Sequence, residues 1–103
     1  MELLTEELRK QLPPLYSQEH VKDPMVICKF FHPLSNMTWY AIEGEPSGGD
    51  FIFFGWVYSD FPELGYFSLN EMQDVKVMGL GIERDLHFPP KRLSEVKKEN
   101  GVT

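Results

Sequence analysis

Three segments of the chain combine β-branched and aromatic residues with short intervening turns, and this pattern limits the possible folds. The segments are MVICKFFH (25–32), MTWYAIEG (37–44) and FIFFGWVY (51–58). Such side chains favour strands, so each segment predicts one strand. The connection PLSN (33–36) has the length of a hairpin loop, and EPSGGD (45–50) predicts a longer, glycine-rich connection. Connections this short favour an antiparallel meander.

Helix signals flank these strands. Thr5 precedes EELRKQL, whose acids come first and whose bases come last, which predicts a helix over 5–12 that ends before two prolines. A fourth strand is expected over 64–68. Ser68 and Glu71 then form a capping box, and we expect a short helix that Gly79 ends. The segment 80–88 is compatible with a fifth short strand, and 91–103 with a helical turn or a loose charged tail.

Length and composition agree with a single α+β domain over residues 1–103. A chain of 103 residues is close to the usual size of one domain. The lone Cys28 excludes an internal disulfide and suits a reducing cytoplasm. The N-terminus is too charged for a secretory signal, and no apolar run approaches the ~18 residues of a membrane span. We therefore expect a cytoplasmic protein that does not contact membranes.

The acidity of the chain is confined to its middle. The net charge is −6, but residues 30–75 hold seven acids and no Lys or Arg, whereas the rest holds nine acids and ten bases. Charge distributed in this way suggests either a functional acidic face or plain solubilising charge. At this net charge, direct binding of nucleic acid is not expected.

A meander places several of these acids at one end of the sheet. Glu43, Glu45 and Asp50 would share that end with the start of the second helix, which carries Glu71 and Asp74. If extended, Glu43 and Glu45 stand about 6.6 Å apart, close to twice the charge spacing along one nucleic-acid strand. Such a rim could attract a basic partner. The acidic candidates for partner contacts are Glu43, Glu45, Asp50, Glu71, Asp74, Asp60 and Glu63.

The strand 51–58 is apolar on both faces. Alternation puts Phe51, Phe53 and Val57 on one face, and the other carries Ile52, Phe54, Trp56 and Tyr58. A central strand covered on both sides explains this pattern. The alternative is an exposed docking patch, also open to homo-oligomerisation, with Trp39, Trp56 and Tyr58 as candidates.

Catalytic and metal-binding patterns are weak. The three histidines lie in different segments without metal-ligand spacing, so no metal or other cofactor is expected. Glu83, Asp85 and His87 would share one side of a strand, which could form a small hydrolase site or a simple ionic network. The network is the better interpretation. We therefore expect a protein without enzymatic activity.

Longer blocks of sequence carry a family resemblance. These are LLTEELRKQLPPLYS, WYAIEGEPSGGDFIFFGWV, ELGYFSLNEM and GIERDLHFPPKRLSEV. The chain resembles small bacterial proteins of unknown function carried by plasmids, integrative elements and phages, some of which are type II-A anti-CRISPR proteins that inhibit Cas9. The resemblance implies a Cas9 inhibitor in the bacterial host cytoplasm that blocks guide or target nucleic acid. An anti-restriction or regulatory protein with another basic partner is the alternative. No family site residues can be transferred.

Overall fold

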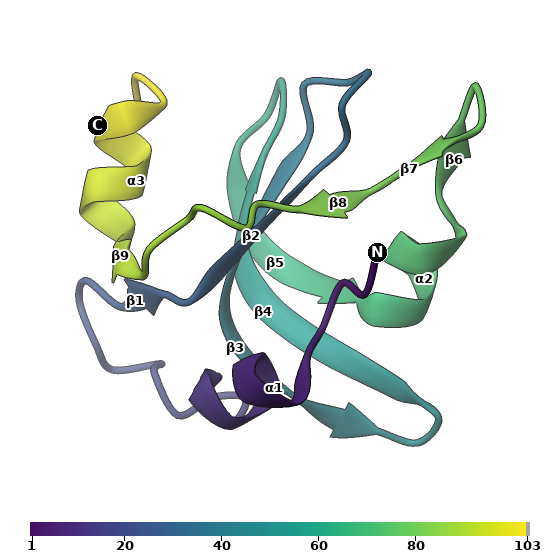
Figure 1. The fold of residues 1–103 in the computed structure, drawn as a ribbon. Helices are drawn as coiled ribbons and strands as arrows, with labels where there is room; N and C mark the ends of the chain where they lie inside the picture. Colours follow the sequence, from purple (N-terminus) through teal and green to yellow (C-terminus); the bar gives the residue numbers. More distant parts are fainter. Residues whose placement is uncertain (103) are drawn as a thin grey trace.

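A five-stranded antiparallel sheet is the framework of the fold (Figure 1). The computed structural model describes residues 1–102. The sheet strands are β2 (Cys28–Phe31), β3 (Thr38–Ser47), β4 (Asp50–Tyr58), β5 (Glu63–Ser68) and β8 (Glu83–Arg84). Their spatial order is β5-β4-β3-β2-β8, so β2 to β5 form the predicted meander. The single strand expected over 25–32 is wrong, because residues 25–26 form β1, which pairs with β9 in a separate sheet, and only 28–31 form β2. The α+β class, the N-terminal helix and the helix after the fourth strand are confirmed.

Three short helices begin where a side chain accepts a backbone N–H. They are α1 (Glu6–Gln11), α2 (Leu69–Asp74) and α3 (Leu93–Glu99). The Thr5 hydroxyl caps α1, and the Ser68 hydroxyl accepts the Glu71 N–H at 3.2 Å, as the capping patterns predict. The cap of α3 comes from a distant residue, because Asp23 accepts the N–H of Ser94 at 2.9 Å.

The C-terminal segment is ordered rather than loose. β9 (Lys91–Arg92) pairs with β1 (Met25–Val26), and α3 follows directly. Buried Leu93 and Val96 fix α3 to the body of the protein. Of the two alternatives for 91–103, the helical one is therefore correct over 93–99. Thr103 lies outside the described residues.

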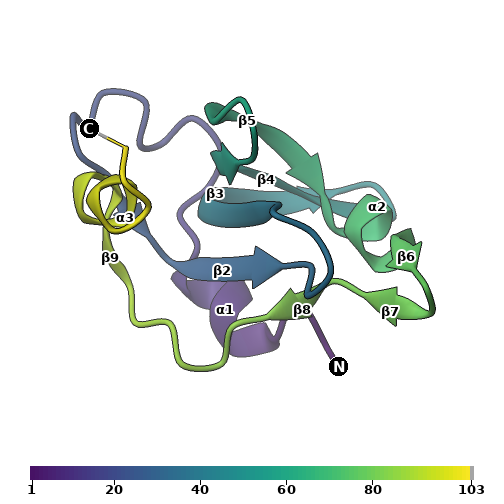
Figure 2. The ribbon, with the colours of Figure 1, turned by 90° about the horizontal axis from the view of Figure 1, so that it is seen from above.

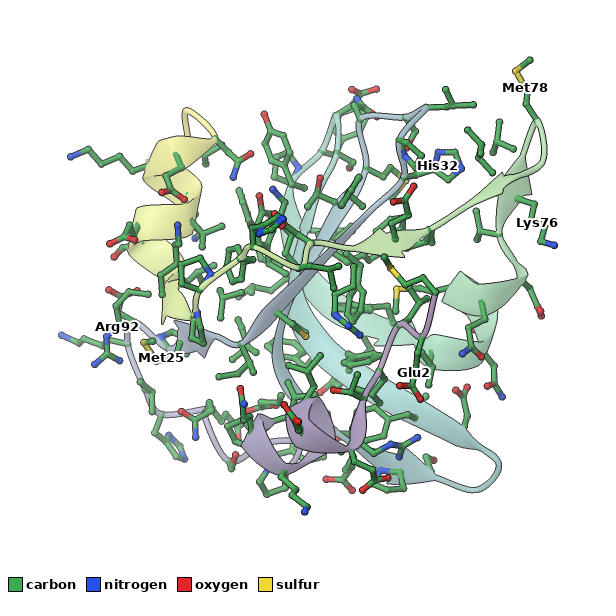
Figure 3. The ribbon with its side chains drawn as sticks, in the orientation of Figure 1. Glu2, Met25, His32, Lys76, Met78 and Arg92 are labelled. Carbon is green, nitrogen blue, oxygen red and sulfur yellow. The ribbon has the colours of Figure 1, made fainter. Side chains whose placement is uncertain are left out.

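Two expectations about turns are wrong. β3 and β4 continue through EPS to a two-residue turn at Gly48 and Gly49, where Gly48 has φ of 61°. The helix expected to reach Gly79 ends at Asp74, and a hairpin of β6 (Lys76–Val77) and β7 (Leu80–Gly81) follows. Met78 and Gly79 both have positive φ, as a tight hairpin turn requires. Figure 3 shows Met78 at the projecting tip of this hairpin.

Both faces of the sheet are covered by the chain itself. Phe51 and Phe53 lie in a core that includes residues of α2 and of the chain before and after α1. Trp56 lies in a second core with residues of α3. Figures 1 and 2 show α3 on the opposite side of the molecule from α2. This confirms the central-strand interpretation of 51–58, in which burying each large apolar side chain contributes about 1.5–3 kcal/mol.

The two edges of the sheet differ in length and protection. β8 has only two residues, and its Arg84 guanidinium donates to the backbone carbonyls of Glu2 (2.6 Å) and Leu3 (2.9 Å). β5 has six residues and, among residues 1–102, pairs only with β4. No helix in residues 1–102 has the length and apolar character to cross a membrane.

Candidate partner-binding surface

Two of the predicted contact residues instead fasten the loop after α1 to β3. Glu43 accepts hydrogen bonds from the backbone N–H groups of Tyr16 (2.9 Å) and Gln18 (2.7 Å). Glu45 accepts the N–H of Leu15 at 2.8 Å. Only 3% of Glu43 is exposed. The expectation that these two carboxylates project from an exposed rim is therefore wrong. They accept hydrogen bonds from backbone N–H groups of the loop that would otherwise have no partner.

Asp50 is also used inside the fold. It accepts the hydroxyl of Ser68 and the backbone N–H of Asn70, at 3.0 Å for the latter. The hydrogen bond from Ser68 is the main cause that lowers the pKa of Asp50 below its ordinary value of 3.8, and the one from Asn70 adds to it. The β3–β4 turn and the start of α2 thus lie together, as the meander argument predicted. The carboxylate itself, however, holds the two together and is not free for a partner.

The remaining predicted acids lie on the surface. Asp60 accepts a hydrogen bond from the Asn36 side chain at 2.7 Å. Glu63, Glu71 and Asp74 are exposed, and in residues 1–102 no Lys or Arg forms an ion pair with them. We refer to these three as the open carboxylates. They lie at the start of β5 and on α2, so the acidic surface is the β5–α2 side of the molecule.

Several of the protein's own cations are engaged elsewhere. Arg9 on α1 lies over the ring of Phe51, 5.0 Å from its centroid, and Lys97 on α3 lies 5.9 Å from a ring centroid of Trp56. Arg9 forms an ion pair with Glu6, Lys29 with Asp85, and Lys91 with both Glu95 and Glu99. In the part of the chain that the structure describes, the basic ends therefore do not fold back onto the open carboxylates.

The two tryptophans proposed for docking are not equivalent. Trp56 is only 2% exposed and packs against Tyr40 and Tyr58. Its prediction as a partner contact is wrong, because strand β4 is covered on that face by α3. Trp39 is half-buried beside the first core. Homo-oligomerisation through an aromatic face stays a prediction, but Trp56 has no surface to contribute to it.

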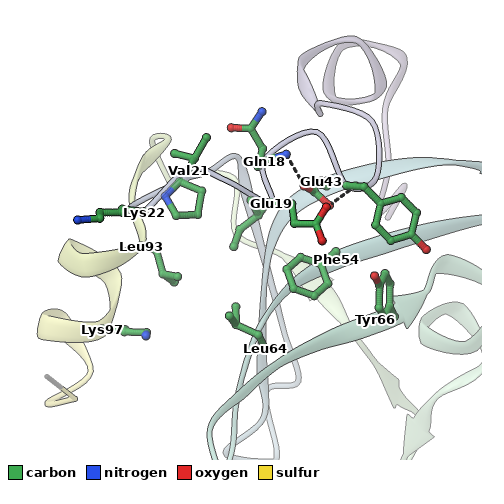
Figure 4. Close-up of a pocket in the computed structure, with 13 residues that line it drawn as sticks. Gln18, Glu19, Val21, Lys22, Glu43, Phe54, Leu64, Tyr66, Leu93 and Lys97 are labelled. Atoms are coloured by element: carbon green, nitrogen blue, oxygen red, sulfur yellow. Dashed lines mark hydrogen bonds between the residues drawn. The ribbon is translucent and has the colours of Figure 1, made fainter.

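A hollow of about 450 Å³ lies beside β5 (Figure 4), in the volume range of ligand and side-chain pockets. It opens between the loop after α1, the outer face of β4 and β5, and α3. Its aromatic wall is formed by Phe54, Tyr66 and Tyr16, with ring centroids 5.0 Å apart for Phe54 and Tyr66 and 6.3 Å for Tyr16 and Tyr66. Glu19 and Glu43 also line it. We call this hollow the tyrosine pocket.

Tyr16 owes its position in this wall to Glu43. Its φ is 71°, a left-handed conformation that costs a residue with a Cβ about 1–2 kcal/mol. The hydrogen bond from its N–H to Glu43 helps to hold it there. Hydrogen bonding with Tyr16 raises the pKa of Tyr66 above 10, and the charges of Glu43 and Glu19 act in the same direction. Tyr66 therefore stays neutral at physiological pH.

A larger hollow, of about 800 Å³, contains the residues considered for hydrolysis. Glu83, Asp85 and His87 all line it. Asp85 accepts the backbone N–H of His87 at 2.9 Å and pairs with Lys29 at 3.7 Å. These contacts make Asp85 part of a structural network. A hydrolase site there stays a prediction.

Other reactive groups add little to the site. Within residues 1–102, no group of three or more His, Cys, Asp or Glu side chains is arranged to hold a metal ion. Cys28 is buried in the first core. Burial raises the pKa of its thiol to about 12, so it stays protonated and unreactive.

The fold and the exposed acids define a small α+β protein with one acidic side. The chain belongs to a family of proteins of unknown function, DUF2958, whose family model matches residues 3–99. No curated protein and no solved structure was found to match the chain. The family assignment therefore covers nearly the whole fold without supplying an activity.

Proposed function

We propose that this protein is a non-catalytic binding module that contacts a basic surface of another protein through its β5–α2 side. One observation carries the proposal: the open carboxylates Glu63, Glu71 and Asp74 are exposed and have no cationic partner within residues 1–102. The stretch from residue 30 to residue 75 also lacks Lys and Arg, so acids outnumber bases on this side, where the exposed Lys76 follows Asp74 by two residues.

Electrostatics favours a basic protein as the partner. Exposed like charges destabilise a fold only slightly, because water and salt screen them. A groove lined by Lys and Arg would gain steering toward the acidic side and would suppress wrong partners. The contact surface differs from the rim that the sequence suggested, because Glu43, Glu45 and Asp50 are occupied by the protein's own donors.

The resemblance to type II-A anti-CRISPR proteins supports a finer proposal, that the partner is Cas9. Cas9 holds its guide, heteroduplex and PAM duplex in positively charged channels. The β5–α2 side would occupy such a channel and block the binding of guide or target nucleic acid. An anti-restriction or regulatory role with another basic protein would use the same surface, and the experiment below separates the two.

A pull-down of Cas9, apo and guide-loaded, tests both levels of the proposal. The variant E63Q/E71Q/D74N removes the open carboxylates and changes the net charge from −6 to −3. The control E2Q/E6Q/E7Q has the same net charge but alters acids in and before α1. We expect wild type and control to retain Cas9 and the open-carboxylate variant to lose at least about tenfold in affinity, about 1.4 kcal/mol.

Each outcome has a defined meaning. Equal losses in the two variants would contradict the β5–α2 surface. No retention of Cas9 by the wild type would contradict the Cas9 proposal. If Cas9 is retained, a mobility-shift assay with guide and target DNA, adding this protein before or after each, identifies the blocked step. A complex that still binds both nucleic acids would overturn the competitive mechanism.

A further inference from the structure

We propose that the free edge of β5 takes up an extended basic segment of the partner as a sixth strand, with one of its side chains entering the tyrosine pocket. This inference rests on the proposed function for the choice of a basic partner, and it adds the mode of contact and the chemistry of the recognised segment. β-Strand addition of this kind obtains affinity from main-chain hydrogen bonds and specificity from pockets for alternate side chains.

The outer edge of β5 has the properties of an accepting strand. It has six residues, and in the described part of the chain no strand lies beside it other than β4. An edge strand carries a row of unpaired N–H and C=O groups, which proteins commonly protect with Lys, Pro or a covering segment. The β5 sequence ELGYFS contains neither Lys nor Pro. Its Leu64 and Tyr66 are 49% and 55% exposed. The opposite edge, by contrast, ends in the two-residue β8, which Arg84 ties to the N-terminus.

Charge selects the occupant. A six-residue strand spans about 20 Å, and Glu63 lies at one end of β5, while Glu71 and Asp74 follow its other end on α2. A second copy of this chain added to the same edge would bring like charges into this surface. A segment with Lys or Arg residues would instead find carboxylates beyond both of its ends. The edge is therefore suited to a basic segment and disfavours self-association.

The pocket gives the added strand a side-chain site. Leu64 pairs with Trp56 and Tyr66 with Phe54, so Leu64 and Tyr66 share the face that carries the tyrosine pocket. Residues directly opposite them in an added strand place their side chains on that same face. A Lys or Arg there could lay its apolar stem along Leu64 and direct its charge toward Tyr66 and Phe54.

Charged side chains of both signs line the pocket: the acids Glu19 and Glu43, and the bases Lys22 and Lys97. Hydrogen bonding with Tyr16 is the main cause of the raised pKa of Tyr66, and the charges of Glu43 and Glu19 act in the same direction. Lys97 of α3, which also lines the hollow, lies over Trp56. The aromatic rings of the pocket, with the exposed Glu19 beside them, are the part of this lining that suits a cationic side chain.

Amide hydrogen exchange with a model peptide tests the edge directly. The probe is an acetylated and amidated six-residue peptide of alternating Lys and Val, and the control peptide alternates Glu and Val. In the free protein, we expect the amides of 63–68 that point away from β4 to exchange rapidly. Saturating Lys/Val peptide should slow them at least tenfold, and the Glu/Val peptide should leave them unchanged. Failure of the Lys/Val peptide to bind, or binding without protection of these amides, would overturn the proposal.

A pair of variants extends the test to the whole partner. Leu64→Lys puts a cation on the exposed edge, and Leu86→Lys adds the same charge at a residue that is 63% exposed and lies just after β8. With circular dichroism showing both folded, we expect only the first to weaken Cas9 binding, by at least tenfold. If Cas9 binds L64K as it binds wild type, the edge proposal fails and the proposed function stands. If the peptide protects β5 but Cas9 does not bind, the edge proposal stands and Cas9 is the wrong partner.

Discussion

Two groups of carboxylates from the same acidic stretch of sequence have opposite surroundings. The inner carboxylates, Glu43, Glu45 and Asp50, accept hydrogen bonds from backbone N–H groups of the chain itself. The open carboxylates, Glu63, Glu71 and Asp74, are exposed. The difference teaches that a run of acids without bases does not identify a binding surface. What decides is whether the fold brings unpaired donors to each carboxylate.

The largest expected effect is on stability, through Glu43. Replacing it in Glu43→Gln removes the negative charge that two backbone N–H groups share, and we expect the free energy of unfolding to fall by about 2 kcal/mol. Urea denaturation measures the change. Glu71→Gln is the matched control on the open side and should change stability by less than about 0.5 kcal/mol. Equal effects of the two substitutions would break the distinction between the groups.

The buried thiol of Cys28 provides a second way to compare the inner carboxylate Glu43 with the open carboxylate Glu71. Cys28 reacts with a thiol reagent only when the protein opens, because it is buried and its pKa is raised to about 12. We expect E43Q to increase the labelling rate about tenfold or more at neutral pH, and E71Q to leave it unchanged. Labelling of both variants at the wild-type rate would show that Glu43 contributes little to holding the fold closed.

Acid titration should reveal the smaller contribution of Asp50. The pKa of Asp50 is lower in the folded state than its ordinary value of 3.8. Its stabilising effect is therefore present above pH 3.8 and is lost as the pH falls through the pKa of the folded state. We therefore expect wild type to lose more stability than Asp50→Asn between about pH 5 and pH 2. Thermal denaturation across this range measures the difference. Parallel pH profiles would contradict the role of Asp50 at the start of α2.

Much of the fold follows from local sequence. β-Branched and aromatic segments gave the positions of β2 to β5, and Thr5 and the Ser68–Glu71 pair gave the starts of α1 and α2. The β6–β7 hairpin was missed because its turn depends on Met78 adopting a positive φ, which its side chain does not favour. Gly79 was recognised as a break, but the local pattern did not show that a strand pair would form around it.

The candidate site was less predictable, because its contacts join residues far apart in sequence. Glu43 and Tyr16 are separated by 27 positions, and no local pattern indicates that one will hold the other. The tyrosine pocket likewise needs Tyr16, on a loop, to meet Tyr66 on β5. The nearest sequence signal was the alternation that puts Glu43 and Glu45 on one face. This alternation correctly placed Glu43 and Glu45 together, but it could not show that both would accept hydrogen bonds from the backbone of the loop after α1.

The salt dependence of binding to Cas9, the proposed partner, tests the central claim most directly. The measurement is the slope of log Kd against log salt concentration for wild type, E63Q/E71Q/D74N and E2Q/E6Q/E7Q. If the open carboxylates make the contact, wild type and the control variant share a steep slope, and the open-carboxylate variant has a flatter one. The same slope for all three proteins would contradict the claim that this side of the molecule meets a basic partner.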